Sequence, residues 1–296
     1  SPFSPADGED FGPTPPLTSG EFKVLSFNIR YSRGNDGENS WRFRKDRVVD
    51  LIRREAPDFL GLQEAMIDPD PDYDQVGYIA ERLPEYDMVV RSRNVDPTRD
   101  EACPIFYLRD RWELDGDRHG TYWLSDTPDV PGSKSWGNTI PRIATWAVFI
   151  EKETDRRVLI VNTHFDHQSE ESRQRSAELV SRRSVGDGRR DLSENQITSD
   201  NAVIMGDFNC GESSPAVEKF HYDTHQNSSE EQLADDSYLT ELTVNNRSSY
   251  NSGYLDTFRI AHPETPATSS GTFGGWTGRT SSDKIDYIFT NISFEV

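Results

Sequence analysis

The chain has 296 residues, a length that fits one large domain or two ordinary ones. No run of about 18 apolar residues occurs, so the sequence excludes a helix that spans a membrane. The net charge of -20 argues against a broad nucleic-acid groove at low ionic strength, because phosphate contacts need basic patches.

Most of the basic residues are Arg, since only six of the 32 Lys and Arg residues are Lys. An acidic, Lys-poor surface predicts a halophilic protein adapted to high salt. At molar salt the screening length shrinks to about 3 Å, and the objection to nucleic acid weakens there. The two cysteines, Cys103 and Cys210, do not make a disulfide framework, and we expect two small buried side chains rather than a bridge.

Composition divides the chain near residue 20. Residues 1–20 are rich in Pro, Ser, Gly and acids and contain no apolar core, which predicts a tether outside the fold. Residues 21–296 form the predicted folded domain. The first residue is Ser1 and not Met, so we expect an upstream segment that was removed or omitted. The sequence leaves the localisation open between a cytoplasmic protein and a secreted protein whose leader was removed.

The first folded elements are a strand, a helix and a second strand. Residues 21–31 form an apolar strand interrupted by Asn28, and residues 41–56 form an amphipathic helix that stops at Pro57. Residues 58–64 form a short buried strand that ends in Glu64. A buried carboxamide needs a partner. Asn28 could simply bond to neighbouring backbone, and Glu64 could be a surface residue that starts a loop.

The middle of the chain alternates short elements with long loops. We expect a charged loop at 94–101 that could rim a pocket, and a long loop at 125–138 that carries Trp136; long ordered loops are often functional. The remaining predicted elements are a helix at 75–83 and strands at 86–91, 104–109, 112–124, 142–151 and 157–163.

The last of these strands continues into His164-Phe165-Asp166-His167. A strand that leads directly into His-x-Asp-His is unusual and indicates a functional site. Two structural alternatives stay open, because one His could cap the loop and Asp166 could only orient its neighbour. A polar helix is predicted next, over residues 169–184, with acids at its N-terminus.

The stretch Val203–Cys210 is a short buried strand that ends in Gly-Asp-Phe-Asn. Asp207 and Asn209 stand two apart, and on an extended backbone such residues project from the same face. A carboxylate and a carboxamide in one small volume suit the binding of a water and a hard cation. The alternative is a strand followed by an ordinary Asp/Asn turn.

The C-terminal quarter is mostly polar. His221 and His225 are four apart, but without a third ligand nearby they do not favour a metal site. The aromatic loop at 271–278 lacks the Lys-Ser/Thr of a phosphate-cradling loop. In the predicted strand 284–289, Asp286 is embedded among apolar residues, where a carboxylate needs a partner. A short helix is predicted at 213–220, a loop at 221–251, and a strand or helix at 255–260.

These polar residues, in this order and spacing, resemble the endonuclease/exonuclease/phosphatase superfamily, the group of pancreatic deoxyribonuclease, abasic-site endonucleases and sphingomyelinases. Three further stretches are similar to a microbial branch of that superfamily: 28–31, 121–125 and 163–167. The resemblance covers residues 21–296. It implies an α/β fold, a four-layer α-β-β-α sandwich of two packed mixed sheets, with the site where strand ends of both sheets meet. The residues that carry it are Asn28, Glu64, His164, Asp207, Asn209 and Asp286.

The resemblance also implies phosphoester hydrolysis with Mg²⁺ or Mn²⁺. Glu64 would be the main metal carboxylate, with Asn28 beside it. Asp207 would position and deprotonate the attacking water, and Asn209 would hold the phosphate or Asp207. His164 would donate to a non-bridging oxygen of the transition state.

Two further residues are candidates for substrate binding. Arg142 could reach a phosphate, although a surface ion pair would explain it equally well. His167 could touch substrate or support His164, as could Asp166. The implied partner is a phosphoester substrate bound by a monomer, and the sequence does not distinguish nucleic acid, lipid headgroup and small nucleotide, or diester and monoester.

One departure from the family pattern bears on function. The family carries a final Ser-Asp-His past the strand that holds Asp286, and no such motif occurs in this sequence. We expect either that the natural chain continues past Val296 or that a catalytic group has been lost, and truncation is the favoured expectation. The alternative functions are a catalytically impaired binding module on the same fold and, with less support, an acidic protein that stores metal.

Overall fold

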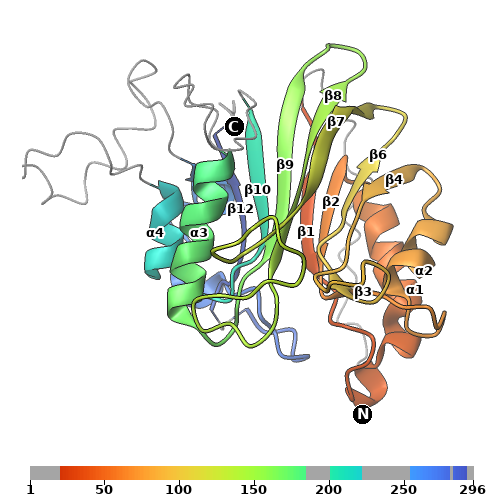
Figure 1. Ribbon diagram of the computed structural model, residues 1–296, viewed down its shortest axis with the longest axis horizontal. Helices are drawn as coiled ribbons and strands as arrows, with labels where there is room; N and C mark the ends of the chain where they lie inside the picture. The colour runs from red at the N-terminus through yellow and green to blue at the C-terminus, as the bar shows by residue number, and fades with distance from the viewer. Residues whose placement is uncertain (1–20, 185–200, 222–253, 281–282, 292–296) are drawn as a thin grey trace, which may run out of the picture.

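The computed structural model describes residues 21–184, 201–221, 254–280 and 283–291. In these ranges the chain folds as the predicted four-layer sandwich. Two mixed sheets lie face to face, helices α1 and α2 cover one outer face, and α3 and α4 cover the other (Figure 1). The predicted tether at 1–20, most of the loops at 185–201 and 221–251, His225 and the last five residues lie outside the described part of the chain.

The first sheet has four strands in the order β1-β2-β6-β4. Strands β1 and β2 run parallel, while β6 is antiparallel to both β2 and β4. The strands span Val24–Asn28 (β1), Phe59–Gln63 (β2), Tyr86–Val89 (β4) and Ile105–Leu108 (β6).

The second sheet has six strands in the order β11-β12-β10-β9-β8-β7, with only β9 and β10 parallel among the neighbouring pairs. The strands span Trp112–Trp123 (β7), Ile143–Glu151 (β8), Arg157–His164 (β9), Ala202–Asp207 (β10), Leu255–Asp256 (β11) and Asp286–Thr290 (β12).

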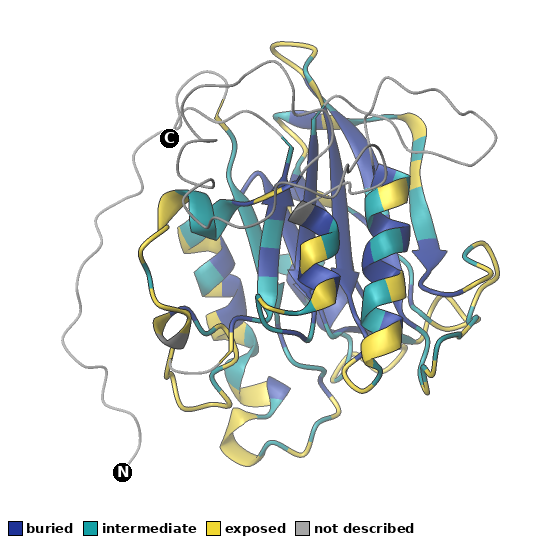
Figure 2. Cartoon of the chain, turned by 90° about the vertical axis from the view of Figure 1, so that its left-hand side faces the viewer, coloured by how far each residue is buried: buried dark blue, intermediate teal, exposed yellow. Residues whose placement is uncertain are grey.

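The longer helices α1, α2 and α3 agree closely with the sequence prediction. Each pairs a buried stripe with a polar outer face, and Figure 2 shows this alternation of blue and yellow on the helices in front of the second sheet. The helices span Gly37–Asn39 (η1), Trp41–Glu55 (α1), Gln75–Arg82 (α2), Glu170–Ser184 (α3), Pro215–His221 (α4), Thr257–Ala261 (α6) and Ala267–Ser269 (η2).

Three of the four apolar clusters among the described residues hold the layers together. One lies between the sheets and joins Phe59 and Ile105 of the first sheet to Phe149, Ile160 and Met205 of the second. The other two lie under the outer helices. Strands β2 and β10 are buried along their whole length because both of their faces are covered.

Buried amides join the two sheets close to the strand ends. Asn162 donates through Nδ2 to the carbonyls of Leu62 and Pro104, both at 2.8 Å, and its Oδ1 accepts from Gln63 Nε2 at 2.7 Å. These bonds satisfy carboxamides that would otherwise be costly to bury. They fix the end of β2, which leads to Glu64, against β9, which leads to His164.

The glycine of Gly-Asp-Phe-Asn is required by a close backbone approach. Gly206 has φ +152°, and a Cβ there would stand 2.0 Å from the carbonyl oxygen of Thr163 on β9. A residue with a side chain would push β10 away from β9. The spacing between Asp207 and His164 therefore depends on this glycine.

Two short strands were not predicted. Strand β3 (Ala65–Ile67) pairs antiparallel with β5 (Asp100–Ala102), so the predicted loop at 94–101 ends in a strand. The segment 255–260, predicted as a strand or a helix, is both, since β11 leads directly into α6. Three-residue strands carry too little alternation to be read from sequence.

Two expectations from composition agree with the structure. Cys103 and Cys210 are both buried and free. In the described ranges, every helix is too short or too polar to cross a membrane.

Candidate active site

The side chain of Asn28 connects the two carboxylates that the sequence singled out. Its Nδ2 donates to Glu64 Oε1 at 3.0 Å and to Asp207 Oδ2 at 2.9 Å. Strands β1 and β2 are parallel and in register, with Asn28 opposite Gln63, so Asn28 and Glu64 emerge at the same edge. Residues 28, 64 and 207, far apart in the chain, thus meet where the two sheets meet.

His164 and Asn209 complete the other side of this group. Asp207 lies opposite His164 in the parallel β9–β10 pair, and His164 Nε2 is 3.8 Å from Asp207 Oδ2. Asn209 Nδ2 lies 3.0 Å from His164 Nε2 and donates to the carbonyl of Phe165 at 3.0 Å. The backbone N–H of Asn209 donates to Asp207 Oδ1 at 2.9 Å.

Three turns at this edge have left-handed backbones. Arg30 follows β1 with φ +54°, Glu64 follows β2 with φ +56°, and Asn209 follows β10 with φ +51°. For residues other than Gly this region is sparsely populated and costs on the order of 1 kcal/mol or more. Such strain persists only where the surroundings impose it, and here it turns Glu64 and Asn209 toward the common centre.

Burial controls protonation at the centre. Burial, followed by the nearby guanidinium groups of Arg142 and Arg93, lowers the pKa of His164 well below its usual value. Asn209 Nδ2 faces Nε2 of this ring, so Nε2 acts as the acceptor and the neutral imidazole carries its proton on Nδ1. Burial raises the pKa of Asp207, against the hydrogen bonds from Asn28 and Asn209.

Asp286 lies directly opposite Asp207 in the antiparallel β10–β12 pair. Burial and the Asp207 charge raise the pKa of Asp286 to about 7. Its Oδ1 is buried without a hydrogen-bond partner in the described part of the chain, while Thr272 Oγ1 accepts from its backbone N–H at 3.1 Å. The structure therefore places Asp286 beside the proposed base.

Arg142 and His167, the two candidate substrate contacts, are neighbours. Arg142 Nη2 lies 3.0 Å from His167 Nδ1, and Arg142 Nε is 3.8 Å from Asp166 Oδ2. Arg142 is buried, with only 4% of its surface exposed, whereas His167 is exposed. Asp166 accepts from the N–H groups of Gln168 and Ser169 in the turn before α3, and Ser169 caps the helix by accepting the N–H of Ser172 through its Oγ at 3.1 Å.

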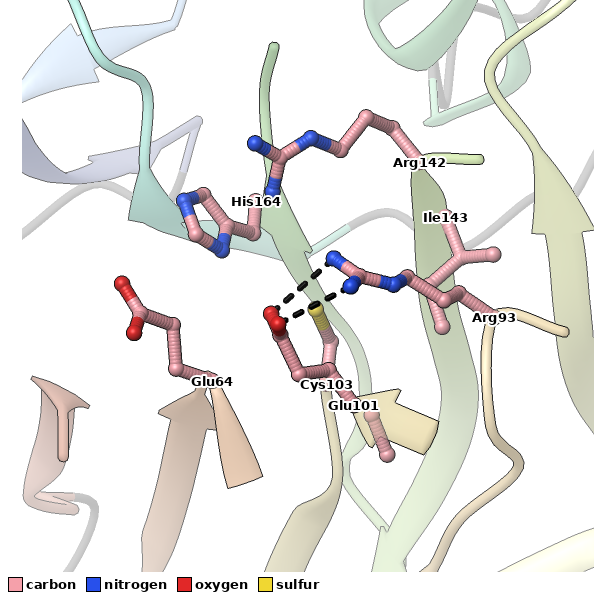
Figure 3. Close-up of a pocket in the computed structure, with 8 residues that line it drawn as sticks. Glu64, Arg93, Glu101, Cys103, Arg142, Ile143 and His164 are labelled. Carbon is pink, nitrogen blue, oxygen red and sulfur yellow. Dashed lines mark hydrogen bonds and ion pairs between the residues drawn. The ribbon is translucent and has the colours of Figure 1, made fainter. Parts of the chain in front are cut away.

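A pocket opens beside His164 and Glu64 and contains two charged residues that sequence reasoning did not assign to the site. These are Arg93 and Glu101, which Figure 3 shows joined to each other by dashed lines. Arg93 donates to both oxygens of Glu101, at 2.9 and 3.0 Å. The only sequence signal was the charge of the loop at 94–101, expected to rim a pocket; its pairing with β3, which draws it inward, was not predictable.

A second unpredicted group holds the Asn28 turn. Arg44, on α1, donates to the carbonyls of Ile29 and Arg30, and its guanidinium lies 5.5 Å from the ring centre of Trp276. Tyr31 N–H donates to Glu64 Oε2 at 3.1 Å, and Arg30 lies 3.7 Å from the same oxygen. The turn after β1 therefore fixes Oε2 of Glu64, while Asn28 at the end of β1 fixes Oε1.

The donor set fits a hard divalent cation with an incomplete protein shell. Mg²⁺ binds through one or two carboxylates and keeps several waters. The carboxylates of Glu64 and Asp207 converge on one amide, and Asp286 adds a third acid nearby, so this edge has a local excess of negative charge. Over the described residues no three His, Cys, Asp or Glu side chains form a ready metal cage. Asn28 presents its N–H to the acids, and its Oδ1 accepts from Arg30 N–H at 2.9 Å.

Comparison with known proteins gives consistent matches. The model of the Endonuclease/Exonuclease/phosphatase family matches residues 25–296. Among curated proteins, uncharacterized protein L388 of Acanthamoeba polyphaga mimivirus is 30% identical over 218 residues, which cover 72% of this chain and 74% of that protein.

Among solved structures, an endonuclease/exonuclease/phosphatase from Bacteroides vulgatus is similar with a TM-score of 0.67 and 29% identity, over 91% of this chain and 86% of that one. A mannosyl-6-phosphatase from Bacteroides thetaiotaomicron has a TM-score of 0.66 at 24% identity, over 91% and 85% of the two chains, and supports the fold.

Proposed function

The chain belongs to the endonuclease/exonuclease/phosphatase family, whose members are phosphoesterases, and from that premise we propose that it hydrolyses phosphoester bonds with the help of Mg²⁺ or Mn²⁺. The observation that carries the proposal is the double hydrogen bond of Asn28, which joins Glu64 and Asp207 at the meeting point of the two sheets. The carboxylate of Glu64 is then available to bind a cation, and that of Asp207 to bind a water.

Glu64 would hold the divalent ion, with Asn28 keeping its carboxylate in place; direct ligation by Asn28 would require its amide oxygen to face the ion. The bound ion would neutralise phosphoryl oxygens and stabilise the leaving oxygen.

Asp207 is the proposed general base. It takes one proton from a water, the water oxygen forms a bond to phosphorus, and the ester P–O bond breaks to release the alcohol, which takes up a proton from solvent. Asn28 and the Asn209 N–H each fix one oxygen of Asp207, so the carboxylate meets the water without reorganising. Its raised pKa makes it a stronger base than an exposed aspartate.

His164 and Arg142 are the proposed stabilisers of the phosphoryl group. A neutral His164 that carries its proton on Nδ1 donates that hydrogen bond to a non-bridging oxygen as charge builds there. Arg142 supplies a buried positive charge on the same side. Asp286 lies opposite Asp207 and adds negative electrostatic potential there; its proposed role is to help position Asp207.

The test is hydrolysis of bis(p-nitrophenyl) phosphate and p-nitrophenyl phosphate at molar salt, with excess Mg²⁺ or with a chelator. We expect turnover that disappears with the chelator and returns with Mg²⁺, and calorimetric Mg²⁺ binding that Glu64→Gln abolishes. Mg²⁺ binding without turnover of either ester would favour the binding-module alternative. Equal turnover with and without the chelator would contradict the proposal.

A further inference from the structure

One buried ion pair beside the proposed catalytic centre differs from the other ion pairs of the molecule. Arg142 and Asp166 are the most deeply buried pair of an arginine and a carboxylate in the described ranges, with 4% and 0% of their side chains exposed. The distance from Arg142 Nε to Asp166 Oδ2 is 3.8 Å, which is too long for a hydrogen bond. Both atoms are buried without a hydrogen-bond partner among the described residues.

A second buried acid shows what the same local structure does when it is closed. Asp68 accepts two hydrogen bonds from Arg33 through Oδ2, at 2.7 and 2.9 Å, and its Oδ1 accepts the N–H of Asp70, two residues further on, at 3.0 Å. Asp166 is anchored in the same way, because its Oδ1 accepts the N–H of Gln168, also two residues further on, at 2.9 Å. The two acids therefore differ in the second oxygen, which is bonded to an arginine in Asp68 and not in Asp166.

Arg142 keeps most of its donors uncommitted. A guanidinium group has five N–H donors and accepts no hydrogen bond. Within the described part of the chain Arg142 uses one of them, toward Nδ1 of His167 at 3.0 Å. Asp166 compensates the buried positive charge but takes none of the N–H groups. Such an arginine is suited to bind an anion, because its charge is already compensated in the fold and its donors need not leave another partner first.

Arg142 lies beside a space that fits one oxygen atom. Arg142 and His164 line the same small pocket, and Figure 3 shows the guanidinium next to the imidazole ring. The pocket has space for about one water, so it suits a single oxygen and not a larger substituent. Glu64, the proposed ligand of the divalent ion, lines the same pocket. A phosphoryl group held between His164 and Glu64 would direct one of its oxygens into this space.

We propose that Asp166 is a positioning residue: it compensates the charge of Arg142 and sets the direction of the guanidinium, so that the N–H groups of Arg142 bind one phosphoryl oxygen in the pocket beside His164. His167 is the second anchor of the same guanidinium, through Nδ1. Asp166 is fully buried and acts only through Arg142. The inference rests on the proposed function, because it assumes that a phosphoryl group occupies this site.

Inorganic phosphate, titrated by calorimetry in the presence of Mg²⁺, tests the positioning role without requiring turnover. Asp166→Asn keeps an oxygen for the N–H of Gln168 and replaces Oδ2 by an NH₂ group, which cannot accept from Arg142. If Asp166 acted only through its charge, the variant would bind phosphate more tightly, because a negative charge near the anion is removed. Since the guanidinium loses its orientation, we expect the affinity for phosphate to fall about 10–100-fold, the range for one hydrogen bond to a charged group.

Two comparisons show whether the effect passes through Arg142. In Arg142→Met protein, the additional change Asp166→Asn should alter the affinity for phosphate about twofold or less, because the effects of residues that act together are not additive. Asp68→Asn is the matched control: it removes a buried acid with the same local bonds, and its partner Arg33 does not line the pocket. Melting temperatures identify any variant that does not fold, and Asp166→Ser, which also offers an oxygen to the turn, replaces Asp166→Asn in that case.

The outcomes separate the positioning role from the proposed function. If phosphate binding weakens in Asp166→Asn and not in Asp68→Asn, while the wild type hydrolyses no ester, the positioning role stands and the proposed function fails. Unchanged or tighter phosphate binding by Asp166→Asn overturns the positioning role, as does an equal loss of affinity in the protein without Arg142. Absence of phosphate binding by the wild type also overturns it, whatever the rate of ester hydrolysis.

Discussion

The two ends of the sandwich both bury carboxylates but treat them in opposite ways. At the end where β2 begins, Asp58 and Glu151 are each bonded to the guanidinium of Arg111. At the end where β2 finishes, Glu64 and Asp207 share one neutral amide, and Asp286 lies opposite Asp207. Both ends are connected through the same five-residue strand.

At the Asp58 end every carboxylate oxygen has a donor. Asp58 accepts from Arg111, from Trp112 Nε1 at 3.0 Å and from Lys23 N–H at 2.8 Å. Glu151 accepts from Arg111 and from Thr154 Oγ1 at 2.6 Å. The hydrogen bonds outweigh burial, so the pKa of Glu151 is lowered.

At the Asp207 end the carboxylates are not fully supplied with hydrogen-bond donors. Burial raises the pKa values of Asp207 and Asp286, and Asp286 Oδ1 has no partner in the described part of the chain. The comparison teaches that buried acids with cationic partners stabilise this fold, and that buried acids without them mark the place where a cation and a substrate would complete the structure.

The largest expected effect is on activity, at the Asp207 end. Asp207→Asn should lower kcat for phosphoester hydrolysis by about 10²–10⁴-fold, since it removes a general base. Its melting temperature should equal or exceed that of the wild type, because a buried charge beside Glu64 and Asp286 is lost. Turnover like that of the wild type in this variant would remove Asp207 from the mechanism.

The second effect is on stability, at the Asp58 end. Arg111→Met leaves Asp58 and Glu151 buried without their shared cation and should lower the free energy of unfolding by about 3–5 kcal/mol. Urea denaturation measures it, and Arg175→Met, which breaks an exposed pair, is the control with a change within about 0.5 kcal/mol. Activity per folded molecule should be retained; loss of activity before unfolding would show that the two ends are not separable.

The third effect is on metal affinity. Asn28→Ala removes the amide that orients Glu64 and should weaken Mg²⁺ binding about 10–100-fold, as is usual for a residue that supports a metal ligand. Calorimetric titration of Mg²⁺ gives the affinity. An unchanged affinity would mean that Tyr31 and Arg30 suffice to hold the carboxylate.

The last effect is in the pH dependence of stability, and its sign should differ between the ends. The lowered pKa of Glu151 gives stability that is present above the unfolded pKa and is lost as the pH falls through the folded value. The raised pKa of Asp286, about 7, means that the folded state holds the proton more tightly, so stability falls as the pH rises from about 4 to 7.

Chemical denaturation from pH 3 to pH 8 in the presence of a chelator measures how the free energy of unfolding changes with pH. Glu151→Gln should remove stability mainly at neutral pH, whereas Asp286→Asn should add stability there and change little at pH 4. If both substitutions changed the pH dependence of the free energy of unfolding in the same direction relative to the wild type, the contrast between the two ends would be contradicted.

The sequence by itself determined most elements of the fold and singled out the polar residues that the structure brings together at the strand ends. Apolar runs that end in Asn28, Glu64, His164 and Asp207 are local signals, because a strand and the polar residue after it are adjacent in the chain. The helices followed equally from their apolar periodicity. The resemblance to the family supplied the layer arrangement, which periodicity alone did not reveal.

Only the tertiary structure decided which residues share a volume. The bond from Asn28 to Asp207 spans 179 positions, and the pairing of β3 with β5 that brings Arg93 and Glu101 to the pocket rests on strands of three residues. Asp58 and Glu64 stand at the two ends of the same strand, and only the packing gives one of them the guanidinium of Arg111 and the other the amide of Asn28. Electrostatic environment depends on distances in space, and those are set by the packing of the sheets.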